Sequence, residues 1–352
     1  MKVLHLLSSN RFSGAENVVC QIIDMFSGDA DIEMTYCSPD GQIRETLKEK
    51  NISFEPITDI SVKEVKRIIN NVKPDVIHAH DMRASFVAAR ACGKIPLVSH
   101  VHNNNFNSRG LSIKSLAYLF AGFKAKHIFW VSQSSFDGYA FHKALQKKSS
   151  VLYNVINVDE LYKKMNSEKT AYNYDVVYLG RLTYQKNPER LIEVIKLVVD
   201  KRQNTKVAIV GTGELEESTK KIVNNYGLQG NVEFLGFQSN PLKLLHDSKV
   251  MLLTSRWEGT PMCALEAMAL GVPIVSTPTD GMNDLIQSGI NGFLNDSDDG
   301  LSENVLNILD NDELRENISK AQIEKSAVIN NCCNYKSELE KLYLTLFKGE
   351  FY

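Results

Sequence analysis

Residues 250–277 read V-M-L-L-T-S-R-W-E-G-T-P-M-C-A-L-E-A-M-A-L-G-V-P-I-V-S-T, and this stretch decides the fold. Apolar or β-branched runs at its two ends flank a segment with helix-start and helix-stop residues. Thr260 suits an N-cap, Pro261 the first helical position and Gly271 the C-terminal end, which predicts a helix over residues 261–270. The pattern therefore predicts a strand, a helix and a second strand, as in an open parallel sheet.

The same alternation of strand and helix continues along almost the whole chain. Many of the β-type runs are continuously apolar, as expected of parallel strands that are buried on both faces. They lie at residues 3–7, 33–37, 76–80, 97–102, 127–132, 151–153, 175–179, 206–210 and 232–235. We therefore predict an α/β fold with two doubly wound, Rossmann-like domains that face each other across a cleft, with ligands at the carboxyl ends of the strands.

The polar segment 154–173 separates two series of strands and marks a domain boundary. We expect an N-terminal domain over residues 1–160 and a C-terminal domain over residues 161–334. The final stretch, residues 335–352, carries leucines and aromatic residues at helical spacing. We expect it to form a helix that packs back on the N-terminal domain.

Composition excludes several classes of protein. The chain has 352 residues, of which 43% are hydrophobic and 23% charged, as in chains that build packed cores. The longest apolar run, residues 116–123, is far shorter than the roughly 20 residues that span a membrane. Six cysteines form no C-x-x-C pair. We expect a cytoplasmic protein with reduced thiols.

Charge is distributed unevenly, although the net charge is only −2. Residues 83–148 contain ten basic residues and one acid, which favours an anionic partner such as a membrane surface, a phosphorylated substrate or a nucleic acid. Within them, residues 108–127 interleave apolar side chains with the cations Arg109, Lys114, Lys124 and Lys126. We expect this segment to bind anionic membranes peripherally. The alternative is a core helix whose lysines face solvent, and the aromatic residues are too few to favour nucleic acid.

The predicted helix over residues 261–270 has the features of an anion site. Its first N–H groups, those of Met262 and Cys263, point toward the preceding loop and would bind a diphosphate. Glu266 lies four residues after Met262 and three after Cys263, and therefore on the same face of the helix. A bound nucleotide would place its ribose hydroxyls there. Glu258 precedes the helix, on the side where a sugar would lie.

A second segment, residues 175–187, reads D-V-V-Y-L-G-R-L-T-Y-Q-K-N. Its apolar strand ends at Gly180, which places Arg181 and Lys186 in the loop at the carboxyl end. Two cations at that position can neutralise a leaving diphosphate without a metal. We therefore expect no metal ion and no other cofactor.

With these motifs the chain resembles the retaining family 4 glycosyltransferases of the GT-B fold, over essentially its whole length. Glu258 and Glu266 reproduce the family's E-x(7)-E, and residues 180–187 its G-R-L-x-x-x-K-N. Residues 13–16 (SGAE) are similar to its G-G-A-E, and residues 291–293 match its N-G-F. The chain departs from the family pattern at Ser13, at residues 154–157 (NVIN) and at Asp284.

The resemblance implies a role for each matching residue. Arg181 and Lys186 would bind the diphosphate, Glu258 the donor sugar and Glu266 the ribose. His102, at the end of a predicted strand, would contact the donor sugar. The backbone would approach the substrate at the glycines and around the helix start, namely at Gly14, Gly211, Gly259, Thr260, Pro261, Met262 and Cys263.

A further group, His78, His80 and Asp81, ends the strand before that of His102. These residues could help to bind the acceptor, or two histidines with Asp81 could hold a metal, although H-x-H alone is weak evidence.

The resemblance implies a metal-independent, retaining glycosyltransferase that uses a nucleotide-sugar donor, expected to be a UDP-sugar. The expected acceptor is a glycan or lipid-linked glycan in the synthesis of a surface polysaccharide such as capsule, exopolysaccharide or lipopolysaccharide. Two alternatives stay open. One is a nucleotide-sugar 2-epimerase of the same fold, and the other is a catalytically silent nucleotide-sugar-binding subunit.

Overall fold

The structure is a computed structural model that describes residues 1–102 and 110–349. The chain divides into two compact units. Unit 1 comprises Met1–Val155 together with the C-terminal segment that begins at Asn331, and unit 2 comprises Ile156–Asn330. The change from the first unit to the second thus falls a few residues before the end of the expected N-terminal domain.

Unit 1 is built on a sheet of seven parallel strands in the order β3-β2-β1-β4-β5-β6-β7. The strands are β1 (Lys2–Leu7), β2 (Glu33–Pro39), β3 (Phe54–Ile57), β4 (Val76–His80), β5 (Leu97–Val101), β6 (His127–Trp130) and β7 (Ser149–Val151). The central strands β1, β4 and β5 are buried along almost their whole length, which explains their continuous apolar pattern.

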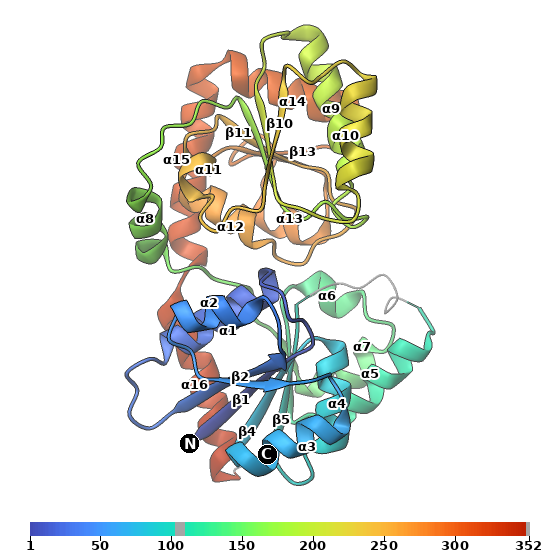
Figure 1. The fold of residues 1–352 in the computed structure, drawn as a ribbon, viewed down its shortest axis with the longest axis vertical. Coiled ribbons are helices and arrows are strands. Elements are labelled where there is room, and N and C mark those ends of the chain that lie inside the picture. Colours follow the sequence, from blue (N-terminus) through green and yellow to red (C-terminus); the bar gives the residue numbers. More distant parts are fainter. Residues whose placement is uncertain (103–109, 350–352) are drawn as a thin grey trace. The chain divides into compact units, whose positions relative to one another are not determined.

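Helices cover both faces of this sheet (Figure 1). They are α1 (Gly14–Met25), α2 (Ile43–Glu49), α3 (Val62–Val72), α4 (Met82–Ala91), α5 (Ile113–Lys124), α6 (Gln133–Asp137), α7 (His142–Leu145) and α16 (Cys332–Lys348), with a 3-10 turn at Gln146–Lys148. Side chains of α3, α4 and α5 form one large core cluster with Leu4, Ile77 and Leu97 of the strands. On the other face α16 packs against β4 and α1, so the C-terminal helix is an integral part of unit 1.

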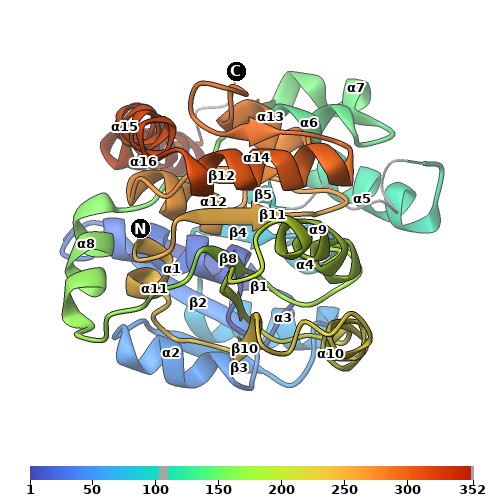
Figure 2. The ribbon, with the colours of Figure 1, turned by 90° about the horizontal axis from the view of Figure 1, so that it is seen from above.

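Unit 2 repeats the design with six parallel strands in the order β10-β9-β8-β11-β12-β13. They are β8 (Val176–Leu179), β9 (Val207–Val210), β10 (Val232–Gly236), β11 (Val250–Leu253), β12 (Ile274–Ser276) and β13 (Phe293–Leu294). The helices are α8 (Val158–Ser167), α9 (Pro188–Lys201), α10 (Glu216–Asn225), α11 (Leu242–His246), α12 (Met262–Ala269), α13 (Asp280–Leu285), α14 (Asp298–Asp310) and α15 (Asp312–Ile329). Helix α14 packs against α9 and lies across β11 and β12, as Figure 2 shows.

Local sequence explains where these helices begin. Ser61, Asp81 and Ser112 each accept a hydrogen bond from the backbone N–H three residues further on, which caps the first turn of α3, α4 and α5. Pro188 occupies the first position of α9, where its missing N–H costs nothing. The two doubly wound parallel sheets confirm the predicted α/β fold.

Candidate functional site

The strand order of unit 2 reverses between β8 and β11, and the loops that follow these two strands are joined by hydrogen bonds. Arg256 N–H donates to the carbonyl of Gln185 at 2.8 Å, and the side-chain amide of Gln185 donates to the carbonyl of Trp257 at 3.0 Å. In an open α/β sheet such a reversal at the carboxyl ends of strands is the usual ligand site. The predicted residues Arg181, Lys186 and Glu258 all lie in these two loops.

The structure brings Lys186 and Glu258 into direct contact. Lys186 Nζ lies 2.5 Å from Glu258 Oε1, and both side chains are nearly buried, at 12% and 6% exposed. Ser255 Oγ donates to the same carboxylate oxygen at 2.6 Å. Burial lowers the pKa of Lys186, but the neighbouring Glu258 outweighs it and leaves the pKa raised, so the lysine is a cation at neutral pH.

Arg181 differs from Lys186 because its side chain is exposed. Its backbone carbonyl accepts a hydrogen bond from Tyr178 Oη at 2.8 Å, which holds the loop against the end of β8. Within residues 1–102 and 110–349, no carboxylate forms an ion pair with its guanidinium. The loop thus carries two cations that can bind a diphosphate, Lys186 in an ion pair and Arg181 without one among the described residues.

Helix α12 begins at Met262, one residue later than expected, with Pro261 rather than Thr260 at the N-cap. The correction has a backbone cause, because Pro261 keeps an extended conformation with ψ of 124°. Its carbonyl accepts hydrogen bonds from the N–H groups of Ala264 and Leu265. The N–H groups of Met262 and Cys263 precede these first helical bonds and form the positive end of the helix.

Glu266 lies one turn further along α12 and is half-buried. Burial raises its pKa to about 7, against the opposing influence of the Lys164 ammonium. Near neutral pH this carboxyl can therefore either accept or donate a hydrogen bond, as a contact to sugar hydroxyls requires. Cys263 is a neutral thiol, because burial raises its pKa to about 12.

Two glycines allow the loops of the site to pack backbone against backbone. A Cβ on Gly211, which has φ of +128°, would lie 2.0 Å from the carbonyl oxygen of Gly180. A Cβ on Gly281 would lie 1.2 Å from the carbonyl oxygen of Gly259. Both approaches are to the chain's own backbone, so Gly211 positions the loop after β8.

The remaining predicted residues, Gly14 and His102, belong to unit 1. Gly14 is the first residue of α1, and Ser13 before it donates a short hydrogen bond to Glu16. His102 directly follows β5 and is 8% exposed.

Asp81 directly follows β4, and the strand order of unit 1 reverses between β4 and β1. Its backbone adopts φ of +100° and ψ of +161°, a region that costs a non-glycine residue on the order of 1–3 kcal/mol. The carboxylate accepts hydrogen bonds from the Ser8 hydroxyl and from the N–H of Ala84, and burial raises its pKa. Strain at a switch point is typical of ligand sites.

His78 and His80 do not serve the acceptor in this structure. Both rings are fully buried, and their nitrogens bond to Tyr343, His5 and His102. Two trios of histidines, His5 with His78 and His80, and His80 with His100 and His102, have ring nitrogens within 4.8 Å of one another.

Ser255, Gln185 and Ser8 contact the candidate residues and were not predicted. Ser255 stands three residues before Glu258, a spacing at which a loop side chain can turn back on the carboxylate, and Gln185 adjoins Lys186. Ser8 follows β1, and only the neighbouring position of β1 and β4 in the sheet brings it to Asp81.

Helix α5 packs one side against the core, where Tyr118 and Ala121 are buried, and exposes apolar side chains on its other side. Leu111, Ile113, Leu116, Phe120 and Phe123 are between 50% and 87% exposed, and we call them the α5 apolar face. Lys114, Lys124 and Lys126 are exposed beside it, whereas Ser108 and Arg109 lie outside the described residues. None of the helices in the described part of the chain is both long and apolar enough to cross a bilayer.

Family comparisons agree with this geometry. A model named Glycosyltransferase Family 4 matches residues 12–160, and one named Glycosyl transferases group 1 matches residues 160–325. An uncharacterized glycosyltransferase of Methanocaldococcus jannaschii is 33% identical over 61% of this chain. The match covers 58% of that relative, so this chain spans little more than half of its length. The UDP-Gal:alpha-D-GlcNAc-diphosphoundecaprenol alpha-1,3-galactosyltransferase of Escherichia coli is 26% identical over 84% of each chain.

Among solved structures, HepE of Anabaena in complex with UDP-glucose has a TM-score of 0.85 with this chain. The likeness covers 98% of this chain and 100% of HepE at 21% sequence identity, so it establishes the fold. The two family models together span residues 12–325, and each of them falls mainly on one of the two units. The chain therefore belongs to the family 4 glycosyltransferases of the GT-B fold.

Proposed function

We propose that this protein transfers a sugar from a UDP-sugar to a hydroxyl of a glycan or lipid-linked glycan, with retention of anomeric configuration and without a metal. The observation that carries the proposal is the buried contact of Lys186 with Glu258 beside the start of α12. Cations and free N–H groups there suit a diphosphate, and the adjacent carboxylate suits sugar hydroxyls. The name of the Escherichia coli relative contains a lipid diphosphate acceptor, which supports a lipid-linked acceptor here. The Anabaena complex contains UDP-glucose, which supports a UDP-sugar donor.

In this proposal Arg181, Lys186 and the first N–H groups of α12 stabilise the charge that develops on the leaving UDP. Glu266 accepts hydrogen bonds from the ribose, and Glu258 contacts the donor sugar. Because Lys186 and Ser255 both bind Glu258 Oε1, this carboxylate is held as a binding group rather than as a free nucleophile. The bond from C1 of the sugar to UDP breaks, the acceptor oxygen bonds to C1 on the same face, and a phosphate oxygen takes the acceptor proton.

The α5 apolar face supports a lipid-linked acceptor, and we propose that it docks on an anionic membrane surface. Apolar side chains of this kind can enter the headgroup region while the exposed Lys114 and Lys124 remain near lipid phosphates. Each such cation adds about 1 kcal/mol of attraction. We infer an anionic membrane as the partner of this face from the combination of apolar side chains and positive charge.

The transfer reaction is tested with purified protein and a panel of UDP-sugars, each with and without diphosphoundecaprenol-linked GlcNAc as a trial acceptor. We expect UDP release that depends on the acceptor, and proton NMR coupling constants of the product that show the donor's anomeric configuration. Glu258→Gln should slow UDP release, whereas Glu189→Gln, at an exposed glutamate in the first turn of α9, should not. Epimerised donor without acceptor would instead identify an epimerase, and UDP binding without turnover of any donor would identify a silent subunit.

Membrane docking is tested by co-sedimentation with phosphatidylglycerol vesicles and with phosphatidylcholine vesicles. We expect binding to the anionic vesicles that falls with salt and with Lys114→Glu and Lys124→Glu. The matched control is the pair Lys201→Glu and Lys221→Glu, which changes the net charge equally at exposed positions of unit 2. Equal loss in both pairs, or no binding at low salt, would refute a specific role of α5.

A further inference from the structure

Hydrogen-bond donors are distributed unequally over the two carboxylate oxygens of Glu258. Oε1 accepts from Lys186 Nζ at 2.5 Å and from Ser255 Oγ at 2.6 Å. Among the residues that the structure describes, the only hydrogen-bond donor to Oε2 is the side-chain amide of Gln185, at 3.5 Å, which is the outer limit of a hydrogen bond. Each carboxylate oxygen accepts about two hydrogen bonds. Oε1 is therefore saturated, and Oε2 is the oxygen that can accept a hydrogen bond from a hydroxyl group of a ligand.

The ammonium of Lys186 has donors to spare. It carries three N–H groups, and Glu258 is the only acceptor of a hydrogen bond from them in the described part of the chain. The ammonium also lies near the first turn of α12, since its charge opposes the rise that burial causes in the pKa of Cys263. Lys186 can therefore bind a diphosphate at the start of α12 and keep a hydrogen bond to Glu258 at the same time.

A bound diphosphate nevertheless competes with Glu258 for this lysine. It carries more negative charge than one carboxylate, so it draws the ammonium toward itself and weakens the ion pair. Ser255 differs from Lys186 because its hydroxyl is neutral and its single proton is already donated to Glu258. When the lysine is shared, the hydroxyl of Ser255 thus becomes the main group that fixes the orientation of the carboxylate.

Hydroxyl groups of two threonines hold Ser255 and the loop after β8 in place. Thr277, which follows β12, donates from Oγ1 to the carbonyl of Ser255 at 2.7 Å. Thr254, which follows β11, donates from Oγ1 to the carbonyl of Asn187 at 3.1 Å. Thr254, Ser255 and Thr277 are at most 3% exposed. Because these hydrogen bonds join the carboxyl ends of neighbouring strands, Ser255 keeps its place whether or not Lys186 moves.

We propose that Ser255 is a positioning residue, which keeps Oε2 of Glu258 directed at a hydroxyl of the donor sugar while Lys186 is shared with the diphosphate. The ligand in this inference is the UDP-sugar of the proposed function, on which the inference rests. All the groups involved belong to unit 2. Since Ser255 acts only through Glu258, its loss should matter only while Glu258 is present.

The first experiment compares the kinetics of single substitutions. Ser255→Ala should lower kcat by about tenfold or more, the effect of losing a hydrogen bond to a charged group, and should change KM for the donor less. Ser255→Thr retains a hydroxyl on the same carbon and should restore most of the loss. The matched control is Ser248→Ala, which removes another buried hydroxyl of unit 2, one that donates to the carbonyl of Leu244 at 2.7 Å. This control should keep wild-type kinetics.

The second experiment is a double-mutant cycle between Ser255 and Glu258. In the Glu258→Gln background, Ser255→Ala should lower kcat by less than about twofold, because the charged group that Ser255 orients has been removed. A loss as large as in the wild-type background would mean that Ser255 acts independently of Glu258, and it would overturn the proposal.

The third experiment examines the site without turnover. UDP is titrated by calorimetry into the wild type, Ser255→Ala, Glu258→Gln and the double variant. Without Ser255, Glu258 depends on Lys186 alone, so sharing the lysine with UDP costs more, and we expect the affinity for UDP to fall by about threefold or more. In the Glu258→Gln background, Ser255→Ala should leave the affinity unchanged. Unchanged affinity in both backgrounds would contradict the sharing of Lys186 and with it the proposal.

The outcomes separate this inference from the proposed function. If UDP affinity depends on Ser255 in this way but no donor is consumed, the proposed transfer fails and the positioning role stands. If transfer is observed and Ser255→Ala matches Ser248→Ala in kinetics and calorimetry, Ser255 has no positioning role. If UDP does not bind, both ideas fail. If Ser255→Ala does not fold, Thr277→Val takes its place, since it loosens the backbone of Ser255 without removing the hydroxyl and should give the same pattern more weakly.

Discussion

Mild acid should unfold unit 1 well before unit 2, because the buried histidines of unit 1 must remain uncharged. Burial holds the pKa of His5 and His102 near 3 and that of His78, His80 and His100 well below the ordinary value. In the unfolded chain each imidazole has a pKa of about 6.5. Since the folded pKa is lowered, the unfolded state binds more protons below this pH, and stability is lost as pH falls.

The magnitude follows from the number of rings. One pH unit below 6.5, each such histidine lowers the free energy of unfolding by about 1.4 kcal/mol. These five rings lower it by about 7 kcal/mol at pH 5.5, and His127, whose pKa burial lowers to about 4, adds to this loss. The loss is comparable with the roughly 5–15 kcal/mol that stabilises a whole domain. Burial raises the pKa of Asp81, which acts in the opposite direction, but this is a single group.

The two tryptophans make the test specific to each unit. Trp130 is buried in β6 of unit 1, and Trp257 lies in unit 2. Urea unfolding of Trp257→Phe between pH 7.5 and 5.5 therefore reports unit 1, and Trp130→Phe reports unit 2. The one histidine of unit 2, His246, is exposed, and burial raises the pKa of Glu266 to about 7, so acid should raise rather than lower the unfolding free energy of unit 2.

A matched variant isolates a single ring. His100→Phe in the Trp257→Phe background should recover about 1.4 kcal/mol of the stability lost between pH 7.5 and pH 5.5. A loss in unit 1 of less than about 2 kcal/mol over this range would refute the reasoning, because the rings would then be able to take up protons in the folded state. Equal losses in the two units would do the same.

The remaining predictions concern the site in unit 2. Lys186→Ala and Arg181→Ala should each lower kcat by about 100-fold, the scale of losing one transition-state donor, and near-normal turnover in both would contradict the assignment. Activity should survive EDTA, and a requirement for Mg²⁺ or Mn²⁺ that is restored by adding the metal would contradict it. Glu266→Gln should mainly raise KM and Glu258→Gln mainly lower kcat, since only Glu258 is proposed to touch the reacting sugar. UDP affinity measured by calorimetry should rise from pH 6 to pH 8 as Glu266, whose pKa is about 7, ionises, and Glu266→Gln should remove this dependence.

Local sequence patterns were sufficient to predict the central strands of both sheets but not all of the strands at the sheet edges. Each expected strand overlaps one in the structure, because buried parallel strands are continuously apolar, but β7 ends at Val151, where the expected strand of residues 151–153 begins. β3 and β13 were not predicted. β3 reads F-E-P-I and lies at an edge, where a proline is tolerated, and β13 has only two residues. Such short segments carry too little periodicity to be recognised.

For the candidate site, the sequence by itself singled out Lys186 and Glu258, since they stand in motifs with the spacing of strand ends and helix starts. Only the tertiary structure decided that they contact each other and share Ser255, because the two loops are 72 positions apart and meet through the strand order.

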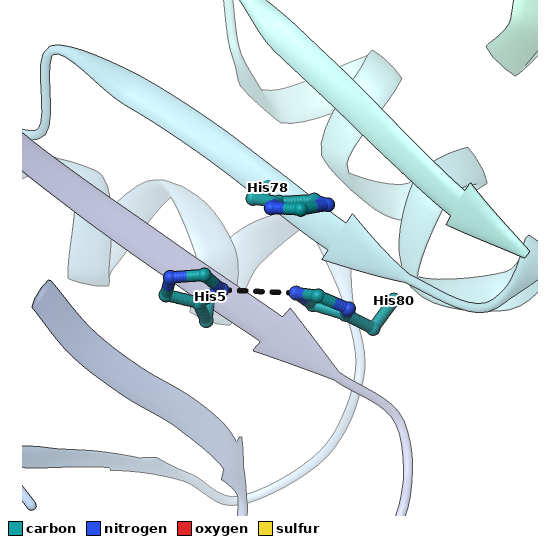
Figure 3. A group of neighbouring side chains, drawn as sticks. All are labelled: His5, His78 and His80. Carbon is teal, nitrogen blue, oxygen red and sulfur yellow. Dashed lines mark hydrogen bonds between the residues drawn. The ribbon is translucent and has the colours of Figure 1, made fainter. Parts of the chain in front are cut away.

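The histidines show the same division. Alternation along a strand placed His100 and His102 on one face, and the sequence also showed that His78 and His80 end another strand. The hydrogen bonds of His5 with His80 (Figure 3) and of His80 with His102 depend on the register of three strands. Register is set by packing between distant segments, so hydrogen bonds that cross strands are decided by the tertiary structure alone.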